Sequence, residues 1–370
     1  MKELLFYYPQ HFNRTQAGTN PFFDAMLEAC DRAGINYDLL EEPDGGTNKP
    51  RNPKAQKADS FYWTVIIIRK LLSIAFRKKD FYWREERAAR LFNLITFGRY
   101  RYRRYITISG SMYFFFANLN PEAEVYDMQH GILYKHHPTF FDLTTLRLRP
   151  QYSKPNLHFL FWGKGYEDCF TKGDEEVLKG RTHVVGYPCK STVTTCEGCR
   201  EKSILVSLQF THDVDAEGLE SMKQALWKFL EETEPLGVKV ILKNHPRYNN
   251  CIALDDLMAR FPHAEMSSAS LGELVGQTFL HVTYYSTTAF EFAEYGIPTF
   301  FLMADKLQDF CRLFYDDFRY PLYAGQTIGE VMERLNDKSN YDADAATVRA
   351  WYDEFYSPFC EEEFLKLIGH

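Results

Sequence analysis

The chain has 370 residues, 45% of them hydrophobic and 25% charged, which is the composition of a folded globular protein long enough for two domains. A net charge of −7 argues against nucleic acid as a partner. No apolar run reaches the roughly 18–20 residues that span a bilayer. The eight cysteines form no compact framework, and the chain opens on a strand-like segment in place of a signal peptide. We therefore expect a reduced, cytoplasmic protein.

Aromatic residues make up 16% of the chain, an unusual share. Such an excess fits broad grooves that stack on sugars or bases, and it equally fits an aromatic-rich core.

The first half of the sequence alternates short apolar segments with amphipathic ones. Strands are predicted at residues 4–8, 36–40, 105–108, 125–128, 159–163 and 182–188, and a helix is predicted from Pro21 toward Ala33. Residues 42–59 are rich in Gly, Pro, Asn and Lys and are predicted to form a surface loop. The alternation predicts a parallel sheet covered by helices.

The same pattern restarts after a polar stretch that ends at Lys202. Strands are predicted at 203–208, 238–243, 264–266, 279–284 and 298–302, with helices at 217–232, 252–260, 270–276 and 287–295 and a mostly helical segment at 342–368. The predicted domains are residues 1–190 and 203–340, joined by a linker at 191–202, with C-terminal helices at 341–370 that pack back on the first domain. No internal repeat is present.

Ser286, Thr287 and Thr288 form a hydroxyl-rich turn before the predicted helix 287–295, and Ser286 is expected as its N-cap. Free backbone N–H groups and the positive end of the helix dipole suit such a turn to phosphate binding without a metal. Glu291 lies one turn into the helix, where its carboxylate is suited to accept hydrogen bonds from ribose hydroxyls. The alternative is an ordinary capped helix with a solvated Glu291.

A second polar cluster, Lys243 to Arg247, directly follows a buried strand. Pro246 stiffens the turn, so His245 and Arg247 are expected to project from the carboxyl end of the strand. His and Arg side chains are suited to neutralising a leaving phosphate. The cluster precedes the Ser286 turn by about 40 residues within one α/β unit.

A third cluster, Asp127 to Gly131, follows a strand of the first domain. Gly131 permits a tight turn that exposes His130, whose neutral imidazole is suited to accept a proton from a hydroxyl. Asp127 is suited to the same work or to orienting His130. His136 and His137 follow closely, but the spacing lacks a further ligand set, so no metal site is predicted.

In this order the motifs resemble those of GT-B transferases of bacterial surface-polysaccharide assembly, in particular CDP-glycerol glycerophosphotransferases and bacterial polysialyltransferases. The motifs are Gln129-His130-Gly131, Gly186-Tyr187-Pro188, Lys243-Asn244-His245-Pro246-Arg247, Ser286-Thr287-Thr288 and Glu291 with Gly296-Ile297-Pro298. The resemblance spans roughly residues 125–302. It implies a GT-B fold, in which two Rossmann-like domains with parallel sheets face a central cleft.

The resemblance also implies roles for single residues. His130 would be the base that activates the acceptor, and His245, Ser286 and Thr287 would contact the phosphates of the donor. A cytidine nucleotide is implied, because those relatives use CMP- or CDP-activated donors. Gln129 and Thr287 depart from the Trp and the Ser of the family, and Glu291 stands where many glycerophosphotransferases carry Asp, so UDP- and GDP-sugars stay open.

The expected function is therefore metal-independent, inverting transfer of a sugar from a nucleotide-activated donor to a cell-surface glycan or a lipid-linked acceptor, with no cofactor. Transfer of glycerol- or ribitol-phosphate from a CDP carrier, nucleotide-sugar epimerisation, and non-catalytic binding of a nucleotide or glycan are the alternatives.

Cys196 and Cys199 form a Cys-x-x-Cys, but no second pair at zinc spacing accompanies it, so a chance pair is favoured. Residues 63–104 combine an apolar run with twelve Lys and Arg residues against three acidic ones. Such a helical stretch predicts contact with an anionic membrane surface, on the inner face of the plasma membrane, or else a solvated helix face.

Overall fold

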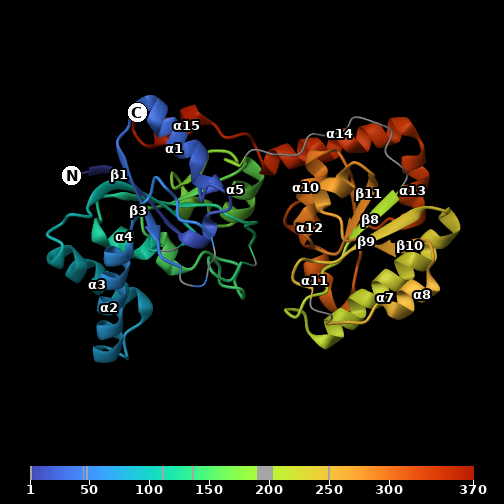
Figure 1. Ribbon diagram of the computed structural model, residues 1–370, viewed down its shortest axis with the longest axis horizontal. Helices are drawn as coiled ribbons and strands as arrows, with labels where there is room; N and C mark the ends of the chain where they lie inside the picture. The colour runs from blue at the N-terminus through green and yellow to red at the C-terminus, as the bar shows by residue number, and fades with distance from the viewer. Residues whose placement is uncertain are drawn as a thin grey trace. The chain divides into compact units, whose positions relative to one another are not determined.

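The computed structural model describes residues 2–44, 46, 49–110, 112–135, 137–189, 203–248 and 251–370. Two compact units result: an N-terminal unit of residues 1–190 with 356–370, and a C-terminal unit of residues 191–355 (Figure 1). The segment predicted as C-terminal helices, 341–370, is thus divided between the units. The predicted linker 191–202, with Cys196 and Cys199, lies outside the described residues.

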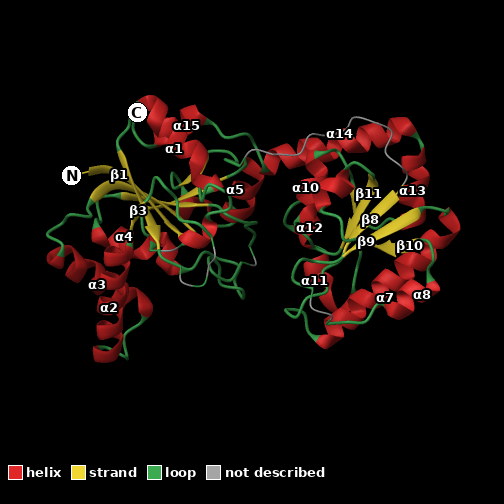
Figure 2. Ribbon diagram, viewed as in Figure 1, coloured by secondary structure: helices red, strands yellow, loops and turns green. Residues whose placement is uncertain are grey.

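The N-terminal unit is built on a seven-stranded parallel sheet with the order β3-β2-β1-β4-β5-β6-β7 (Figure 2). The strands are β1 (Lys2–Pro9), β2 (Tyr37–Glu42), β3 (Gln56–Lys57), β4 (Tyr102–Ile108), β5 (Glu124–Met128), β6 (Leu157–Phe161) and β7 (Thr182–Val184). The helices are α1 (Pro21–Ala33), α2 (Asp59–Ala75), α3 (Phe81–Ile95), α4 (Tyr113–Leu119), α5 (Lys164–Thr171), α6 (Glu175–Leu178) and α15 (Glu361–Leu367), with 3-10 turns η1 (Gln10–Phe12) and η2 (Pro150–Ser153).

Local sequence signals explain why α1 has the predicted bounds. The Asn20 side chain accepts a hydrogen bond from the Phe22 N–H, Pro21 occupies the first helical position, and Gly34 ends the helix in the left-handed conformation. The predicted loop 42–59 is interrupted by β3, which extends the sheet by one short strand, and it ends where α2 begins.

The last residues of the chain are bound to the strand end at Gly186. The Tyr187 N–H donates to the Ser357 carbonyl at 2.7 Å, and the Cys360 N–H donates to the Val185 carbonyl at 2.9 Å. Gly186 has φ +85°, and a Cβ there would lie 2.2 Å from the Pro358 carbonyl oxygen, so only glycine fits. The Gly186-Tyr187-Pro188 motif therefore holds the C-terminal segment against the N-terminal unit.

The C-terminal unit has a five-stranded parallel sheet with the order β10-β9-β8-β11-β12. The strands are β8 (Ser203–Ser207), β9 (Lys239–Lys243), β10 (Ala264–Met266), β11 (Thr278–Thr283) and β12 (Thr299–Phe301). The helices are α7 (Ala216–Thr233), α8 (Asp255–Arg260), α9 (Leu271–Val275), α10 (Thr288–Glu294), α11 (Gln308–Cys311), α12 (Leu313–Asp316), α13 (Ile328–Asn336) and α14 (Lys338–Phe355), with 3-10 turns η3 (Glu234–Leu236) and η4 (Asp305–Leu307).

Helices cover both faces of this second sheet. Ile204 and Val206 of β8 belong to the larger apolar cluster, whereas Leu205 belongs to a smaller cluster with Phe292 of α10. Successive strand residues point to opposite faces, so an unbroken apolar strand requires two covered faces. Both units are therefore Rossmann-like α/β domains, as the sequence predicts.

Many of the aromatic side chains are buried in the core. Tyr7, Tyr8, Tyr102, Tyr105 and Tyr113 are among the largest fully buried side chains. Among the described residues, no helix is both long and apolar enough to cross a membrane.

Candidate functional site

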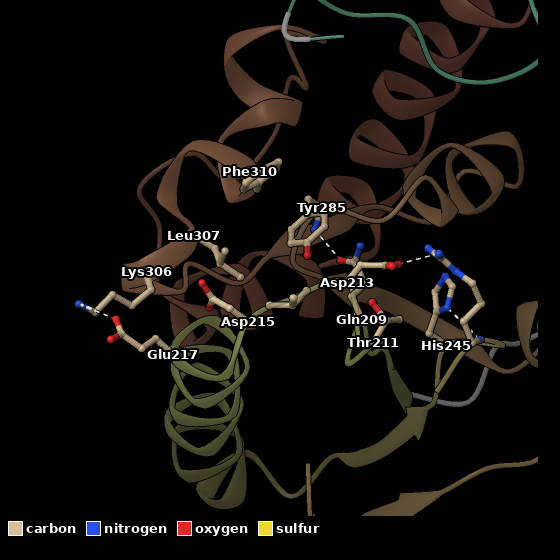
Figure 3. Close-up of a pocket in the computed structure, with 12 residues that line it drawn as sticks. Gln209, Thr211, Asp213, Asp215, Glu217, His245, Tyr285, Lys306, Leu307 and Phe310 are labelled. Carbon is tan, nitrogen blue, oxygen red and sulfur yellow. Dashed lines mark hydrogen bonds and ion pairs between the residues drawn. The ribbon is translucent and has the colours of Figure 1, made fainter. Parts of the chain in front are cut away.

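A cavity of about 450 Å³ opens at the carboxyl edge of the C-terminal sheet (Figure 3). It is lined by Gln209, Thr211, Asp213, Val214, Asp215, Glu217, His245, Arg247, Tyr285, Lys306, Leu307 and Phe310. These residues come from the segments after β8, β9 and β11 and from the region of η4 and α11. Four stretches of chain that are distant in sequence thus build one concave site.

The topology explains why the cavity forms here. Strand β8 lies between β9 and β11 in the sheet. After β8 the chain continues to β9 on one side, and after β11 it continues to β12 on the other side. The loops after β8 and β11 therefore diverge and leave a crevice, which is where open α/β sheets bind ligands.

His245 reaches the cavity from the turn after β9. Its Nδ1 atom accepts the backbone N–H of Arg247 at 3.1 Å, so the neutral ring carries its proton on Nε2. Burial, with the nearby Arg247 charge, lowers the pKa of His245 below its ordinary value. At neutral pH the side chain is therefore an uncharged N–H donor.

The cations of the cavity already have acidic partners. The Arg247 guanidinium lies 2.6 Å from the Asp213 carboxylate, and Lys306 lies 3.6 Å from Glu217. Arg247 is predicted to neutralise phosphate, and in the structure its charge is paired with that of Asp213. Both cations are half or more exposed, so these pairs cost little to break.

Gln209 fixes one wall of the cavity. Its side-chain oxygen accepts the Tyr285 N–H at 2.8 Å and the Thr283 hydroxyl at 3.3 Å, which joins the loop after β8 to the end of β11. The Tyr285 and Phe310 rings lie 5.7 Å apart, and Figure 3 shows both at the cavity wall. Aromatic faces of this kind are suited to stacking on a planar base or a sugar.

The hydroxyl-rich turn after β11 differs from the expectation. The N-cap of α10 is Thr287, whose side chain makes no capping bond, whereas Ser286 was expected there. The Ser286 hydroxyl does accept the Thr288 N–H, at a long 3.3 Å. Helix α10 begins one residue later than predicted. Ser286 is buried, and Thr287 is exposed.

Several residues predicted to bind the donor do not line this cavity. Ser286, Thr287, Thr288, Glu291 and Lys243 are absent from its wall. Glu291 is an exposed residue of α10, yet the surrounding protein partly desolvates its carboxylate, which with Glu294 raises the pKa of Glu291. The Lys243 carbonyl accepts the Leu208 N–H, which ties β9 to the loop that bears Gln209.

A buried histidine that the sequence did not single out supports the same edge. His281 of β11 contacts the Ser207 hydroxyl at 2.9 Å, the Thr299 hydroxyl at 3.0 Å and the Thr288 hydroxyl at 3.3 Å. Full burial lowers its pKa to about 3, so the ring is neutral. His281 therefore joins strands β8, β11 and β12 to the start of α10.

In the N-terminal unit, His130 follows β5 at the carboxyl edge of its sheet. The ring packs edge-to-face on Phe12 of η1, 5.5 Å between centroids, so the loops after β1 and β5 meet there. The residue is exposed to solvent, but the protein atoms around it lower the pKa of His130 to about 4, and the charges of His137, Arg14 and His11 act in the same direction. His130 is therefore neutral at physiological pH.

Asp127 has a structural set of partners. Its carboxylate accepts the Gly110 N–H at 3.0 Å and the Thr107 hydroxyl at 3.2 Å, and no described hydrogen bond joins it to His130. Burial raises the pKa of Asp127 to about 6. Asp127 holds the turn after β4, so the expectation that it orients His130 is not met.

Gln129, and not Asp127, positions the turn that carries His130. Its side-chain amide donates to the Gly131 carbonyl at 2.8 Å and accepts the Trp162 N–H at 3.0 Å. The turn is thereby tied to the end of β6. Gln129 is buried, so these bonds lie in a low-dielectric environment where they are strong.

The described residues contain no group of three or more His, Cys, Asp or Glu side chains placed to hold a metal ion. His136 lies outside the described residues, and Lys135 forms a buried ion pair with Asp174 at 2.7 Å.

No protein-family model matches the sequence, and no curated protein does. Solved structures do match. The chain aligns over its whole length with an S. aureus TarM mutant in complex with Fondaparinux, alpha-GlcNAc-glycerol and UDP, at a TM-score of 0.54, 9% identity and 100% coverage of both chains. A histidine variant of the wall teichoic acid polymerase TagF aligns at a TM-score of 0.50 and 13% identity, covering 99% of this chain and 87% of that one.

These neighbours are GT-B glycosyltransferases, and the chain has the GT-B fold, with two α/β units on seven- and five-stranded parallel sheets. The fold is the one that the motif resemblance implies.

Sequence reasoning missed most of the cavity wall. Asp213, Tyr285, Lys306 and Phe310 belong to no motif and come from three separate loops. One signal was present: the polar residues 209–215 directly follow the strand 203–208, as Lys243 to Arg247 follow their strand. Open α/β sheets bind ligands at the carboxyl ends of their strands, so residues 209–215 are candidates on the same ground as His245.

Proposed function

We propose that the chain is a glycosyltransferase that moves a sugar from a nucleotide-activated donor, a CMP-sugar in the first instance, to a cell-surface glycan or lipid-linked acceptor. The cavity of the C-terminal unit holds the donor, and His130 of the N-terminal unit is the acceptor base. The observation that carries the proposal is the cavity at the strand crossover, whose lining includes the neutral N–H donor His245 and the cations Arg247 and Lys306.

Donor binding rests on three kinds of group in the cavity. The Nε2–H of His245 is available to donate to a phosphate oxygen, because Nδ1 is occupied by the Arg247 N–H. An incoming phosphate competes with Asp213 for Arg247 and with Glu217 for Lys306. Tyr285 and Phe310 offer aromatic surface to the base or the sugar. The TarM structure with UDP has the same fold, which supports a nucleotide as the ligand class.

In the proposed reaction the acceptor oxygen forms a bond to the anomeric carbon and its proton passes to His130, while the bond from that carbon to the donor phosphate breaks. Hydrogen bonds and positive charge at the phosphate then stabilise the leaving group, which is often the largest catalytic contribution. His130 is a better candidate than Asp127, because its ring is exposed while the Asp127 carboxylate is held by Gly110 and Thr107.

A CDP-polyol phosphotransferase is the second candidate. The order of the motifs around His130, His245 and Ser286 favours it, and TagF, a wall teichoic acid polymerase, shares the fold. Here the acceptor oxygen would attack phosphorus, and the product would contain a phosphodiester in place of a glycosidic bond.

A thermal-shift panel of CMP, CDP, UDP and GDP tests the donor site. A nucleotide present at about 100 times its Kd stabilises the protein by roughly 2.7 kcal/mol. We expect a cytidine nucleotide to shift the melting temperature most, and the shift to shrink in the His245→Ala variant. A protein that none of the four stabilises would contradict the proposal.

Product analysis separates the remaining alternatives. Mass spectrometry of a reaction with a lipid-linked acceptor distinguishes a glycosidic product from a phosphodiester. Conversion of the donor without any acceptor would indicate an epimerase, and binding without conversion would indicate a non-catalytic partner.

A further inference from the structure

Helix α2 of the N-terminal unit is apolar on two opposite faces. Its inner face, with Phe61, Val65 and Ile68, is buried in the unit. Its outer face carries four exposed large apolar side chains at helical spacing: Trp63, Ile67, Leu71 and Ile74. A surface helix normally has one apolar stripe, toward the core, so packing within the unit does not account for the second stripe.

Helix α3 and the turns around it extend this apolar surface. Figure 1 shows α2 and α3 lying side by side at one end of the N-terminal unit. Leu91, Leu94 and Ile95 share one side of α3, and Leu94 is 71% exposed. Phe97, in the turn after α3, is 93% exposed. Phe76 and Phe81, in and after the α2–α3 turn, are exposed as well.

The two helices of the hairpin are joined to each other and to α4 of the unit. Arg69 of α2 and Glu85 of α3 form a two-point pair, with Nε and Nη2 at 2.7 and 2.5 Å from the carboxylate oxygens of the buried Glu85. The Arg69 guanidinium also lies over the Phe115 ring of α4, 5.8 Å from its centroid. The exposed apolar residues are therefore a fixed surface of the folded protein and not the face of a loosely attached helix.

Basic residues border this apolar surface. Seven of them form no ion pair within the described residues: Lys70, Arg77, Lys78, Lys79, Arg84, Arg87 and Arg99. Lys79 and Arg87 lie over the Trp83 ring, at 5.6 and 5.3 Å from its centroid. Elsewhere the chain is acidic, since its net charge is −7 although residues 63–104 carry twelve basic and three acidic side chains.

We propose that the α2–α3 hairpin docks on an anionic lipid bilayer, with its apolar side chains in the interface and its cations on the lipid phosphates. An apolar helix face bordered by Lys and Arg side chains is the combination that interfacial helices use. The competing occupant, a second copy related by a twofold axis, would bring the unpaired cations of both copies together and is disfavoured by repulsion. The proposal is independent of the proposed transferase activity.

Flotation of the full chain with vesicles tests this. We expect the protein to float with vesicles of phosphatidylglycerol and phosphatidylcholine in equal parts, to float far less with phosphatidylcholine alone, and to detach as salt rises. No flotation with the anionic vesicles would overturn the proposal.

Two sets of substitutions, each with a matched control, locate the surface. The charge set is Arg77→Gln, Lys78→Gln and Lys79→Gln, and its control is Lys172→Gln, Lys179→Gln and Lys228→Gln. The apolar set is Ile67→Ser, Leu71→Ser and Ile74→Ser, and its control is Leu143→Ser with Leu236→Ser. All the replaced side chains are exposed, so the fold should survive, which circular dichroism checks.

Each basic residue near an anionic bilayer contributes roughly a five-fold factor in partitioning, so the charge set should lower vesicle binding by about 100-fold. The apolar set should lower it at least as much, and both controls should bind nearly as the unmodified protein does. Equal binding by a set and its control would overturn the proposal. So would a dimer, seen by light scattering, that the apolar set abolishes and vesicles do not dissociate. Nucleotide binding should be unchanged in every variant, which separates this test from that of the donor site.

Discussion

The two units present different chemistry at the same place in their folds, the carboxyl edge of a parallel sheet. In the N-terminal unit this edge carries His130, whose neutral ring packs on Phe12. In the C-terminal unit the corresponding edge carries a cavity with paired charges and an N–H donor. One architecture therefore carries a neutral imidazole in one unit and a charge-lined cavity in the other, because the loops, not the sheets, determine the chemistry.

The largest effect is expected at His130. If it is the acceptor base, His130→Ala should lower kcat by about 10²–10⁴-fold and leave nucleotide affinity unchanged. The control is His11→Ala, an exposed histidine that stacks on the same Phe12. Steady-state kinetics with a calorimetric Kd make the comparison, and near-normal turnover in His130→Ala would remove the base assignment.

The second prediction concerns His245, the proposed hydrogen-bond donor to the nucleotide phosphate. Removing an N–H donor to a charged phosphate costs about 1.5–3 kcal/mol, so His245→Ala should weaken nucleotide binding by roughly 10–100-fold. His263→Ala, at the amino end of β10, is the control and should bind normally. If His245→Ala lowers kcat without changing Kd, the division of labour between the two edges is wrong.

The closing of the N-terminal unit by its own tail gives a stability prediction. Gly186→Ala adds both a left-handed backbone penalty and a clash with Pro358, whereas Gly180→Ala, at φ +71° with nothing within 4 Å, adds the backbone penalty alone. We expect about 1–2 kcal/mol of destabilisation for Gly180→Ala and clearly more for Gly186→Ala. Urea unfolding measures both, and equal losses would contradict the close packing of residues 356–370.

Lowering the pH should change the unfolding free energy of the two units differently. The pKa of His281 is lowered to about 3 in the folded state, so below pH 6.5 the unfolded chain takes up a proton that the folded chain does not. The stabilising contribution is complete above pH 6.5 and is lost as pH falls toward 3, by about 1.4 kcal/mol per pH unit. Unfolding free energies at pH 7, 6 and 5 should therefore fall less steeply in His281→Asn.

In the N-terminal unit, His158 and Asp127 have opposite effects on stability as the pH falls. Burial beside His183 lowers the pKa of His158 to about 4, so His158 loses stability on acidification in the same way as His281. The pKa of Asp127 is raised to about 6, so the folded state takes up that proton first and gains stability as pH falls below 6. Asp127→Asn should therefore make this unit more sensitive to acid.

The smallest effect is expected at Asp213. Its pair with Arg247 is exposed, and such pairs contribute up to about 1 kcal/mol. Asp213→Asn should release Arg247 and tighten nucleotide binding by a few-fold. The control is Asp309→Asn, an exposed residue of α11 that does not line the cavity. Weaker binding in Asp213→Asn would mean that the carboxylate itself holds the ligand.

The central strands of both sheets could be predicted from sequence because they are apolar runs bounded by polar turns. Strand β3 could not, because it consists of the two exposed polar residues Gln56 and Lys57. Helix α1 was predicted to its ends because Asn20, Pro21 and Gly34 mark them. The N-cap of α10 was misplaced by one residue, since Ser286 and Thr287 are chemically equivalent capping residues and only the backbone path distinguishes them.

The site could be predicted only in part. His245 follows a strand directly and lines the cavity, whereas Lys306 and Phe310 reach it from η4 and α11, and the position of η4 depends on its packing against α7. The partners of Asp127 were also beyond the sequence, because Thr107 and Gly110 lie nearly 20 residues away on a neighbouring strand and its turn.

The return of residues 356–370 to the N-terminal unit has a consequence for biosynthesis. Ser357 and Cys360 supply backbone hydrogen bonds to Tyr187 and Val185, and α15 contributes the buried Phe364. A ribosome releases these residues after the whole of the C-terminal unit has emerged. The N-terminal unit is therefore completed only after the C-terminal unit has been synthesised, and nascent chains stalled before Tyr356 should carry a finished C-terminal unit and an N-terminal unit that still lacks α15.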